Sequence, residues 1–251
     1  MISKKLKILK EKNIELLIGV ELEFYLEDKN FPILNLQTEN FTIKKEIGEG
    51  QFEAVFPLNF NILQILKSVI LFRNQYKNVL NFQGYASPEQ PNSGMQFNFS
   101  LWKNGENMME NADFRNSIIF SLLKFLPESL NSFVKNENCI LRLTDVEKIK
   151  KFRNSPFNIS CGGNGNRTTA IRVIDERSEK YLLQGKAVKG YRIEHRVPSS
   201  SASVLKSFHA ILKAILHGIE IPGSPENVEI LHSNAFEEEI ISVFSLTPFY
   251  L

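Results

Sequence analysis

The sequence predicts an α+β protein in which helices pack on one face of a curved antiparallel β-sheet. In residues 17–26 and 94–101, apolar and polar side chains alternate, which is typical of strands with one buried face. Segments with apolar residues at helical spacing separate these strands, the longest of them over 58–80. Because the apolar face of such a sheet must be covered, we expect helices on that side and a polar hollow on the other.

Length and composition favour one large domain. The chain has 251 residues, and no repeat or linker divides it, so we expect a single domain over residues 1–251. The net charge of +2 gives no reason to expect nucleic acid or a membrane as partner. The two cysteines are too few for a disulfide framework, and neither a signal-peptide core nor an apolar run of about 20 residues occurs. These features predict a cytoplasmic protein.

In the first half of the chain, the apolar spacing predicts one helix before the first strands in the sequence and another after them. The N-terminal segment has Ile2, Leu6 and Leu9 on one face and lysines on the other. Two glycines interrupt the pattern between the second strand and the long helix. The expected elements are a helix over 2–13, strands over 17–26 and 41–45, an irregular segment over 46–53, and a helix over 58–80.

The second half is expected to alternate helices and strands. Pro127 should break the helical pattern that begins at residue 111, and Asp145 is a suitable N-cap for a short basic helix. The expected elements are a strand over 94–101, a helix over 111–125 with a weak continuation to 133, a helix over 145–152, a Gly/Asn-rich loop that becomes a strand within 158–173, a hairpin or loop over 175–190, a strand over 190–198, a helix over 201–220, and a helical pair over 225–244.

The strand over 17–26 carries two glutamates on the same face. Glu21 and Glu23 are two residues apart, so both point to the side opposite the apolar residues. Two adjacent carboxylates repel each other and resist burial unless a cation lies between them. A divalent metal would meet this need, whereas a strand with one solvated face would need no metal.

The same alternation places polar side chains on one face of three later segments. These side chains are Gln51 and Glu53; Gln96, Asn98 and Ser100; and Arg192, Glu194 and Arg196. A curved sheet would gather them in one hollow. Clustered glutamates indicate a hard divalent cation, and arginines facing the same space indicate phosphate oxygens. Together they predict a site for Mg²⁺ or Mn²⁺ and a nucleoside triphosphate.

In their order along the chain, these motifs resemble the catalytic domain of the glutamine synthetase family. Each motif is weak alone, but all occur in the family's order between residues 19 and 198. They are Glu21-Leu-Glu23; Glu46 followed by Gly50-Gln51-Phe-Glu53; Asn92-Ser-Gly94-Met95-Gln96-Phe-Asn98-Phe-Ser100; Asn166-Arg167-Thr-Thr-Ala-Ile-Arg172; and Arg192-Ile-Glu194-His-Arg196-Val-Pro198.

The resemblance implies ATP and two Mg²⁺ or Mn²⁺ ions as cofactors. It assigns the first metal to Glu23, Glu46 and Glu53, with Glu49 as the alternative to Glu46, and the second metal to Glu21, Gln96 and Glu194. It assigns nucleotide contacts to Asn98, Ser100, Arg172, Arg192 and Arg196. Of these, Arg172 and Arg196 would contact the transferring phosphate, and Arg167 would contact the substrate carboxylate or its phosphorylated form.

The implied activity is that of an ATP-dependent carboxylate–amine ligase acting through γ-glutamyl phosphate, on glutamate or a related carboxylate. Gln96 and Asn98 stand where the family has histidines, and residues 153–158, where a flap glutamate is expected, contain no acid. We therefore expect an amine larger than ammonia. Two alternatives remain open: a non-catalytic relative that binds a nucleotide or metabolite, and a phosphotransferase resembling the guanidino kinases.

The resemblance also bears on assembly. The family's N-terminal β-grasp domain, which completes a neighbour's active site in the large rings, has no counterpart in the 251 residues. A homo-oligomer would therefore not share its sites in the usual way. The remaining partners we expect are the small-molecule substrates.

Overall fold

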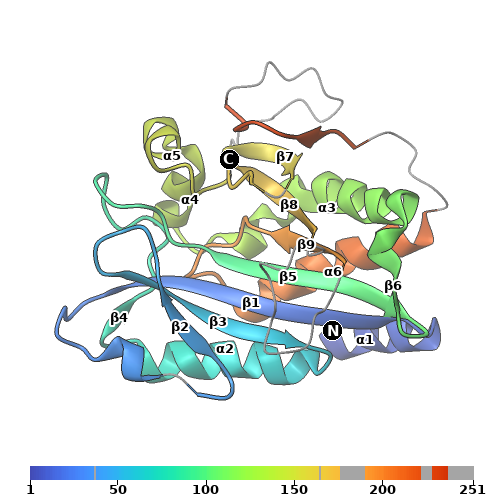
Figure 1. The fold of residues 1–251 in the computed structure, drawn as a ribbon, viewed down its shortest axis with the longest axis horizontal. Coiled ribbons are helices and arrows are strands. Elements are labelled where there is room, and N and C mark those ends of the chain that lie inside the picture. The colour runs from blue at the N-terminus through green and yellow to red at the C-terminus, as the bar shows by residue number, and fades with distance from the viewer. Residues whose placement is uncertain (37, 164, 176–189, 222–227, 237–251) are drawn as a thin grey trace.

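One sheet with helices on one side forms the framework of the protein in the computed structural model (Figure 1). The structure describes residues 1–36, 38–163, 165–175, 190–221 and 228–236. Within these residues the sheet has ten strands, and all neighbours are antiparallel except at one edge, where β7 runs parallel to β8 and to β10. The predicted α+β fold with a mostly antiparallel sheet is confirmed.

The strand that carries Glu21 and Glu23 lies in the middle of the sheet, between β3 and β5 (Figure 1). The order across the sheet is β10-β7-β8-β9-β5-β1-β3-β2, with β4 paired to β1 and β6 to β5. The strands are β1 (Glu15–Leu26), β2 (Thr42–Lys45), β3 (Gln51–Asn59), β4 (Leu80–Asn81), β5 (Met95–Lys103), β6 (Glu106–Asn107), β7 (Asn158–Gly162), β8 (Thr169–Asp175), β9 (Tyr191–His195) and β10 (Ile230–Leu231).

Six α-helices and two short 3₁₀ turns complete the described part of the chain. The predicted cap of α5 is confirmed, since the Asp145 side chain accepts a hydrogen bond from the Lys148 backbone N–H. The helices are α1 (Ile2–Glu11), α2 (Ile62–Tyr76), α3 (Ala112–Phe133), α4 (Glu137–Thr144), α5 (Val146–Phe152) and α6 (Val204–Glu220), and the 3₁₀ turns are η1 (Ile33–Leu36) and η2 (Met108–Glu110). No helix among the described residues is long and apolar enough to span a membrane.

Several predicted boundaries were wrong. Pro127 does not break α3, because the buried face continues past it through Leu130 and Phe133, and this packing outweighs the one backbone hydrogen bond that a proline removes. The predicted loop at 158–162 is strand β7, in which Ile159 and Cys161 are buried. The long helix starts at Ile62, since β3 continues to Asn59.

The predictions for the last part of the chain can be compared only in part. Residues 228–236 contain the short strand β10, so the described portion of the predicted helical pair at 225–244 is not helical. The rest of that pair, and residues 176–189 of the predicted hairpin, lie outside the described residues. Helix α4, which the apolar spacing did not reveal, begins after Asn136, whose side chain accepts a hydrogen bond from the Cys139 backbone N–H.

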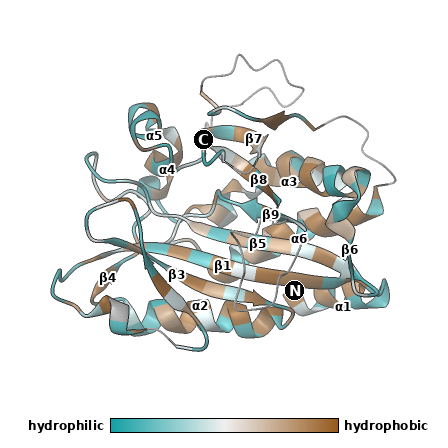
Figure 2. Cartoon of the chain, viewed as in Figure 1, coloured by the Kyte–Doolittle hydropathy of each residue, from teal (hydrophilic) through white to brown (hydrophobic). Residues whose placement is uncertain are grey.

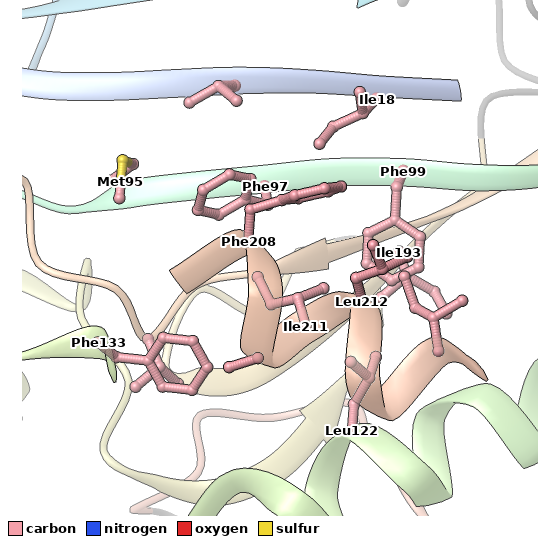
Figure 3. Packing of buried hydrophobic residues seen from close by; sticks show 14 of the residues in the cluster. Ile18, Met95, Phe97, Phe99, Leu122, Phe133, Ile193, Phe208, Ile211 and Leu212 are labelled. Carbon is pink, nitrogen blue, oxygen red and sulfur yellow. The ribbon is translucent and has the colours of Figure 1, made fainter. Parts of the chain in front are cut away.

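The hydrophobic core lies between the sheet and the helices. The apolar stripe predicted for β1 is buried, with Ile18, Val20, Leu22 and Phe24 each at most 1% exposed. Figure 3 shows Phe97 of β5 against Phe208 of α6, with their ring centroids 6.1 Å apart. In Figure 2, α2, α3 and α6 each carry both hydrophobic and hydrophilic residues, as expected for helices with one buried face. This packing leaves the other face of the central strands for polar side chains.

Candidate functional site

Strand pairing brings most of the predicted site residues onto one face of the sheet. In the central strands, Glu21 lies opposite Gln96, and Glu23 opposite Glu53. Residues directly opposite each other in antiparallel strands point to the same side, so these side chains are neighbours. The next row runs from Asn98 through Glu194 to Arg172, across β5, β9 and β8.

Glu23 is the most enclosed of the carboxylates near β3. Its side chain is 5% exposed. The carboxylate accepts hydrogen bonds from the Gly94 backbone N–H at 2.5 Å and from Gln96 Nε2 at 2.9 Å. Glu53 is also buried, and its Oε1 lies 3.6 Å from Lys44 Nζ. The turn after β2 carries Glu46, whose Oε2 accepts a hydrogen bond from the Ile47 N–H.

Burial and mutual repulsion raise the pKa values of these glutamates. For Glu23, burial and then the charge of Glu46 raise the pKa to about 7. For Glu53, burial and then the charge of Glu21 raise the pKa to about 9. The pKa of Glu21 is also raised, first by burial and then by Glu194. A positive charge among these carboxylates would therefore stabilise their ionised forms.

The donors fit a hard divalent cation, although the carboxylates are not assembled around one point. Among the described residues, no three or more His, Cys, Asp or Glu side chains lie close enough together to hold a metal ion. Carboxylate and amide oxygens are nevertheless the ligands that Mg²⁺ and Mn²⁺ prefer, and the raised pKa values indicate a deficit of positive charge. The two metal sites thus remain predictions, and binding would require side-chain rotation toward the ion.

The other half of this face is organised around Glu194. Its Oε2 accepts hydrogen bonds from Arg196 Nη1 at 2.6 Å and from Arg172 Nη1 at 3.1 Å. Burial would raise the pKa of this carboxyl, but the charges of Arg196 and Arg172 outweigh that effect and hold the pKa at about 2. Arg196 Nη1 also donates to Gln96 Oε1 at 2.8 Å, and Arg192 Nε donates to Asn98 Oδ1 at 3.0 Å. A continuous polar network therefore joins β5 and β9.

Three candidate residues take no part in the contacts around Glu23 and Glu194 described above. They are Arg167, Ser100 and Glu49. Arg167 is exposed in the connection between β7 and β8, and Ser100 is buried, where it accepts a hydrogen bond from Trp102 Nε1 at 2.8 Å. Glu49 is exposed and pairs with Lys29 at 3.0 Å. Glu46, in contrast, is close enough to raise the pKa values of Glu23 and Glu53, which favours it over Glu49 as a ligand.

Two residues that support this face were not found from the sequence. Arg142 of α4 is 1% exposed and donates to the backbone oxygens of Val197 at 2.9 Å and Arg196 at 3.0 Å, which holds the chain that follows β9. Asn154 is buried, its Nδ2 donates to the Asn92 backbone oxygen, and its own backbone oxygen accepts from Arg196 Nη2. The available signal for Arg142 was its position among the apolar residues of α4, but neither the helix nor the arginine was predicted.

Comparisons with known proteins show the family of the chain. A family model described as "Glutamine synthetase, catalytic domain" matches residues 32–242. Glutamine synthetase from Thermococcus kodakarensis is 27% identical over 218 residues, covering 82% of this chain and 44% of that protein. The Pyrococcus abyssi enzyme is 29% identical over 255 residues, covering 84% of this chain and 54% of that protein. The chain thus spans about half the length of the curated relatives it matches.

Solved structures share the fold at lower identity. A structure described as "GmaS/ADP complex-Conformation 1" aligns with a TM-score of 0.72 and 20% identity, covering 92% of this chain and 60% of that one. Glutamine synthetase from Plasmodium falciparum aligns with a TM-score of 0.61 and 17% identity, covering 99% of this chain and 65% of that one. The family model matches most of the chain, and the solved structures share its fold. The chain therefore belongs to the glutamine synthetase catalytic-domain family.

Proposed function

We propose that this protein is an ATP-dependent carboxylate–amine ligase that activates glutamate or a related carboxylate. The observation that carries the proposal is the pairing of two zones on one sheet face. One zone holds Glu21, Glu23 and Glu53, whose pKa values are raised by burial and by their mutual repulsion, and the adjacent zone holds arginines around Glu194. A nucleotide with divalent cations carries the complementary charges for both zones.

The metal ligands that we propose from the resemblance to the family fall into two groups. Glu23, Glu46 and Glu53 would hold one ion. The second would bind Glu21, Gln96 and Glu194. The hydrogen bonds described for the Glu194 carboxylate all reach Oε2, which leaves Oε1 suited to a metal ligand. When bound, ATP and its Mg²⁺ or Mn²⁺ ions would supply the phosphoryl group that turns a carboxylate into an electrophile.

Hydrogen bonds to other groups of the protein orient the arginines. Glu194 holds the guanidinium groups of Arg172 and Arg196 within hydrogen-bond distance, and the Asn154 backbone oxygen fixes a second nitrogen of Arg196. Donors held in this way can stabilise charge on a transferring phosphoryl group without first reorganising. Arg192, tied to Asn98, would contact the nucleotide at the far end of the network.

The nature of the amine is proposed from residues 153–158. This segment contains no acid, so no side chain in it can take a proton from ammonium. Asn154 Oδ1 is buried and has no hydrogen-bond partner among the described residues. An amide oxygen can accept a hydrogen bond from a neutral amine but is a poor base. We therefore propose an amine larger than ammonia that arrives uncharged.

Phosphate release tests the proposal. The protein would be incubated with ATP, Mg²⁺, glutamate and a panel of primary amines and amino acids, with Glu194→Gln as the inactive control. The expected result is phosphate release that requires both glutamate and one class of amine. If the protein binds nucleotide with metal but no amine or carboxylate stimulates turnover, the ligase proposal is wrong and the non-catalytic alternative stands. The amides Gln96 and Asn98, which stand where the family has histidines, are the observation that favours this alternative.

A gain-of-function variant tests the amine separately. Asn154→Glu should introduce measurable activity with ammonium at pH 7, because it places a base in this segment. Asn154→Gln keeps the amide and should not. Equal ammonium activity in the unmodified protein and both variants would show that Asn154 does not determine the choice of amine.

A further inference from the structure

Lys44 of β2 lies at the edge of the carboxylate zone, which consists of Glu21, Glu23, Glu46 and Glu53. It lies directly opposite Glu53 in the antiparallel ladder, and Glu53 in turn lies opposite Glu23. The three side chains therefore form a row across β2, β3 and β1. Lys44 Nζ approaches Glu53 Oε1 to 3.6 Å.

This contact is a direct ion pair between a cation and one of the clustered carboxylates. Of the ion pairs recorded among the described residues, only Lys44–Glu53 involves any of the four glutamates Glu21, Glu23, Glu46 and Glu53. The arginines are engaged with Glu194, Gln96 and Asn98 in the neighbouring zone. Lys44 is thus the cation in direct contact with Glu53, whereas the charges of Arg192 and Arg196 act on Glu21, and those of Arg142 and Arg196 act on Glu23.

The two partners differ in their access to water. The Lys44 side chain is 60% exposed, whereas the Glu53 side chain is 10% exposed. A largely exposed ammonium regains its hydration when it leaves, so breaking the pair costs the lysine little. The buried carboxylate, in contrast, needs a cation. A divalent ion could therefore replace Lys44 at Glu53.

We propose that Lys44 is a built-in counter-cation that competes with the divalent metal for Glu53 and so lowers the affinity of the first metal site. This inference rests on the proposed function, because it assumes that Glu53 is a metal ligand. It adds a residue that tunes the affinity and is not itself a ligand. An ammonium group cannot coordinate a metal, so its effect comes entirely from its charge and its position.

Direct Mn²⁺ binding tests the inference without any catalytic reaction. Free Mn²⁺ would be measured by electron paramagnetic resonance in titrations of the purified full chain, in low salt and without nucleotide. Lys44→Met removes the charge and keeps an unbranched stem. It should raise the Mn²⁺ affinity about two- to fivefold, which is the upper part of the range for one exposed ion pair. In EDTA, the same variant should have a lower melting temperature than the unmodified protein. Added Mn²⁺ should raise the melting temperature of the variant by more than that of the unmodified protein.

Two variants serve as controls. Lys44→Arg keeps the charge and should bind Mn²⁺ as the unmodified protein does. Lys45→Met removes a neighbouring exposed lysine whose side chain points to the opposite side of the strand, and it should change neither measurement. If Lys44→Met does not fold, Lys44→Gln replaces it.

The outcomes separate the two claims. If the unmodified protein binds Mn²⁺ and Lys44→Met binds it no more tightly, the inference about Lys44 is wrong while the metal site stands. If neither the folded unmodified protein nor any folded variant binds Mn²⁺, the metal site of the proposed function is wrong, and the inference falls with it. Equal tightening by Lys45→Met would also overturn the inference, because it would reflect net charge and not position.

Discussion

Replacing Glu53 by glutamine should stabilise the protein in the absence of metal. The Glu53 carboxyl is buried among Glu21, Glu46 and Glu23, and its pKa is raised from 4.5 to about 9. A raised carboxyl pKa means that the folded state keeps a proton that the unfolded state has lost. Stability therefore falls as the pH rises from about 4.5 to about 9. Glutamine does not titrate, so the gain from Glu53→Gln should grow across the same interval.

The magnitude follows from the size of the pKa shift. About 3.5 pH units separate 4.5 from pH 8, and each unit corresponds to about 1.4 kcal/mol, which gives a ceiling of about 5 kcal/mol. Losing the ion pair with Lys44 subtracts up to about 1 kcal/mol, and the neighbouring carboxylates share part of the titration. The expected gain is about 2–4 kcal/mol at pH 8 and close to zero at pH 5.

Chemical unfolding at a series of pH values in EDTA measures this gain. Glu49→Gln is the matched control, because Glu49 is exposed in the same turn and pairs with Lys29. It should show no gain at any pH. Added Mn²⁺ should stabilise the unmodified protein more than Glu53→Gln. If Glu53→Gln is no more stable than the unmodified protein at pH 8, the claim that the buried carboxylates around Glu53 destabilise the metal-free protein is wrong.

Three further variants give distinct outcomes. Glu194→Ala leaves two arginines without their buried partner, so it should lower the free energy of unfolding by about 3–5 kcal/mol and abolish metal-dependent nucleotide binding in calorimetry; intact binding would contradict the site assignment. Gln96→His should bind Mn²⁺ more tightly, because imidazole is a better ligand than an amide; equal or weaker binding would place Gln96 outside the second site. Phe97→Ala should lower stability by about 3–5 kcal/mol by opening a cavity against Phe208, while the folded variant keeps its Mn²⁺ affinity; a loss of affinity would show that the core and the site are coupled.

The central strands could be predicted because local pattern and tertiary environment agree there. In β1, apolar residues alternate with Glu21 and Glu23, and the structure buries the apolar set against the helices. Prediction failed where tertiary packing overrode a local signal. Pro127 predicts the end of a helix, yet α3 continues past it because α3 packs on α6. Helix α4 has only eight residues, too few for a clear apolar period.

The candidate site divides in the same way. The motifs that supply its residues could be found from the sequence, because each motif is nearly contiguous in the chain, and their roles stay predictions. Contacts that depend on strand register or on a missed helix could not be predicted. The pairing of Lys44 with Glu53 requires the β2–β3 register, and the support that Arg142 gives to the chain after β9 requires the position of α4. Gly94, which donates to Glu23, reaches it only through the β1–β5 pairing.

The most direct test of the central claim is anomalous diffraction from crystals grown with Mn²⁺ and a non-hydrolysable ATP analogue, recorded at the manganese absorption edge. The account predicts two peaks on the polar face of the sheet. One should lie among Glu23, Glu46 and Glu53, and the other beside Glu194 Oε1 and Gln96. The same crystals should show Lys44 Nζ moved away from Glu53. The absence of peaks on this face, with nucleotide bound elsewhere, would contradict the account.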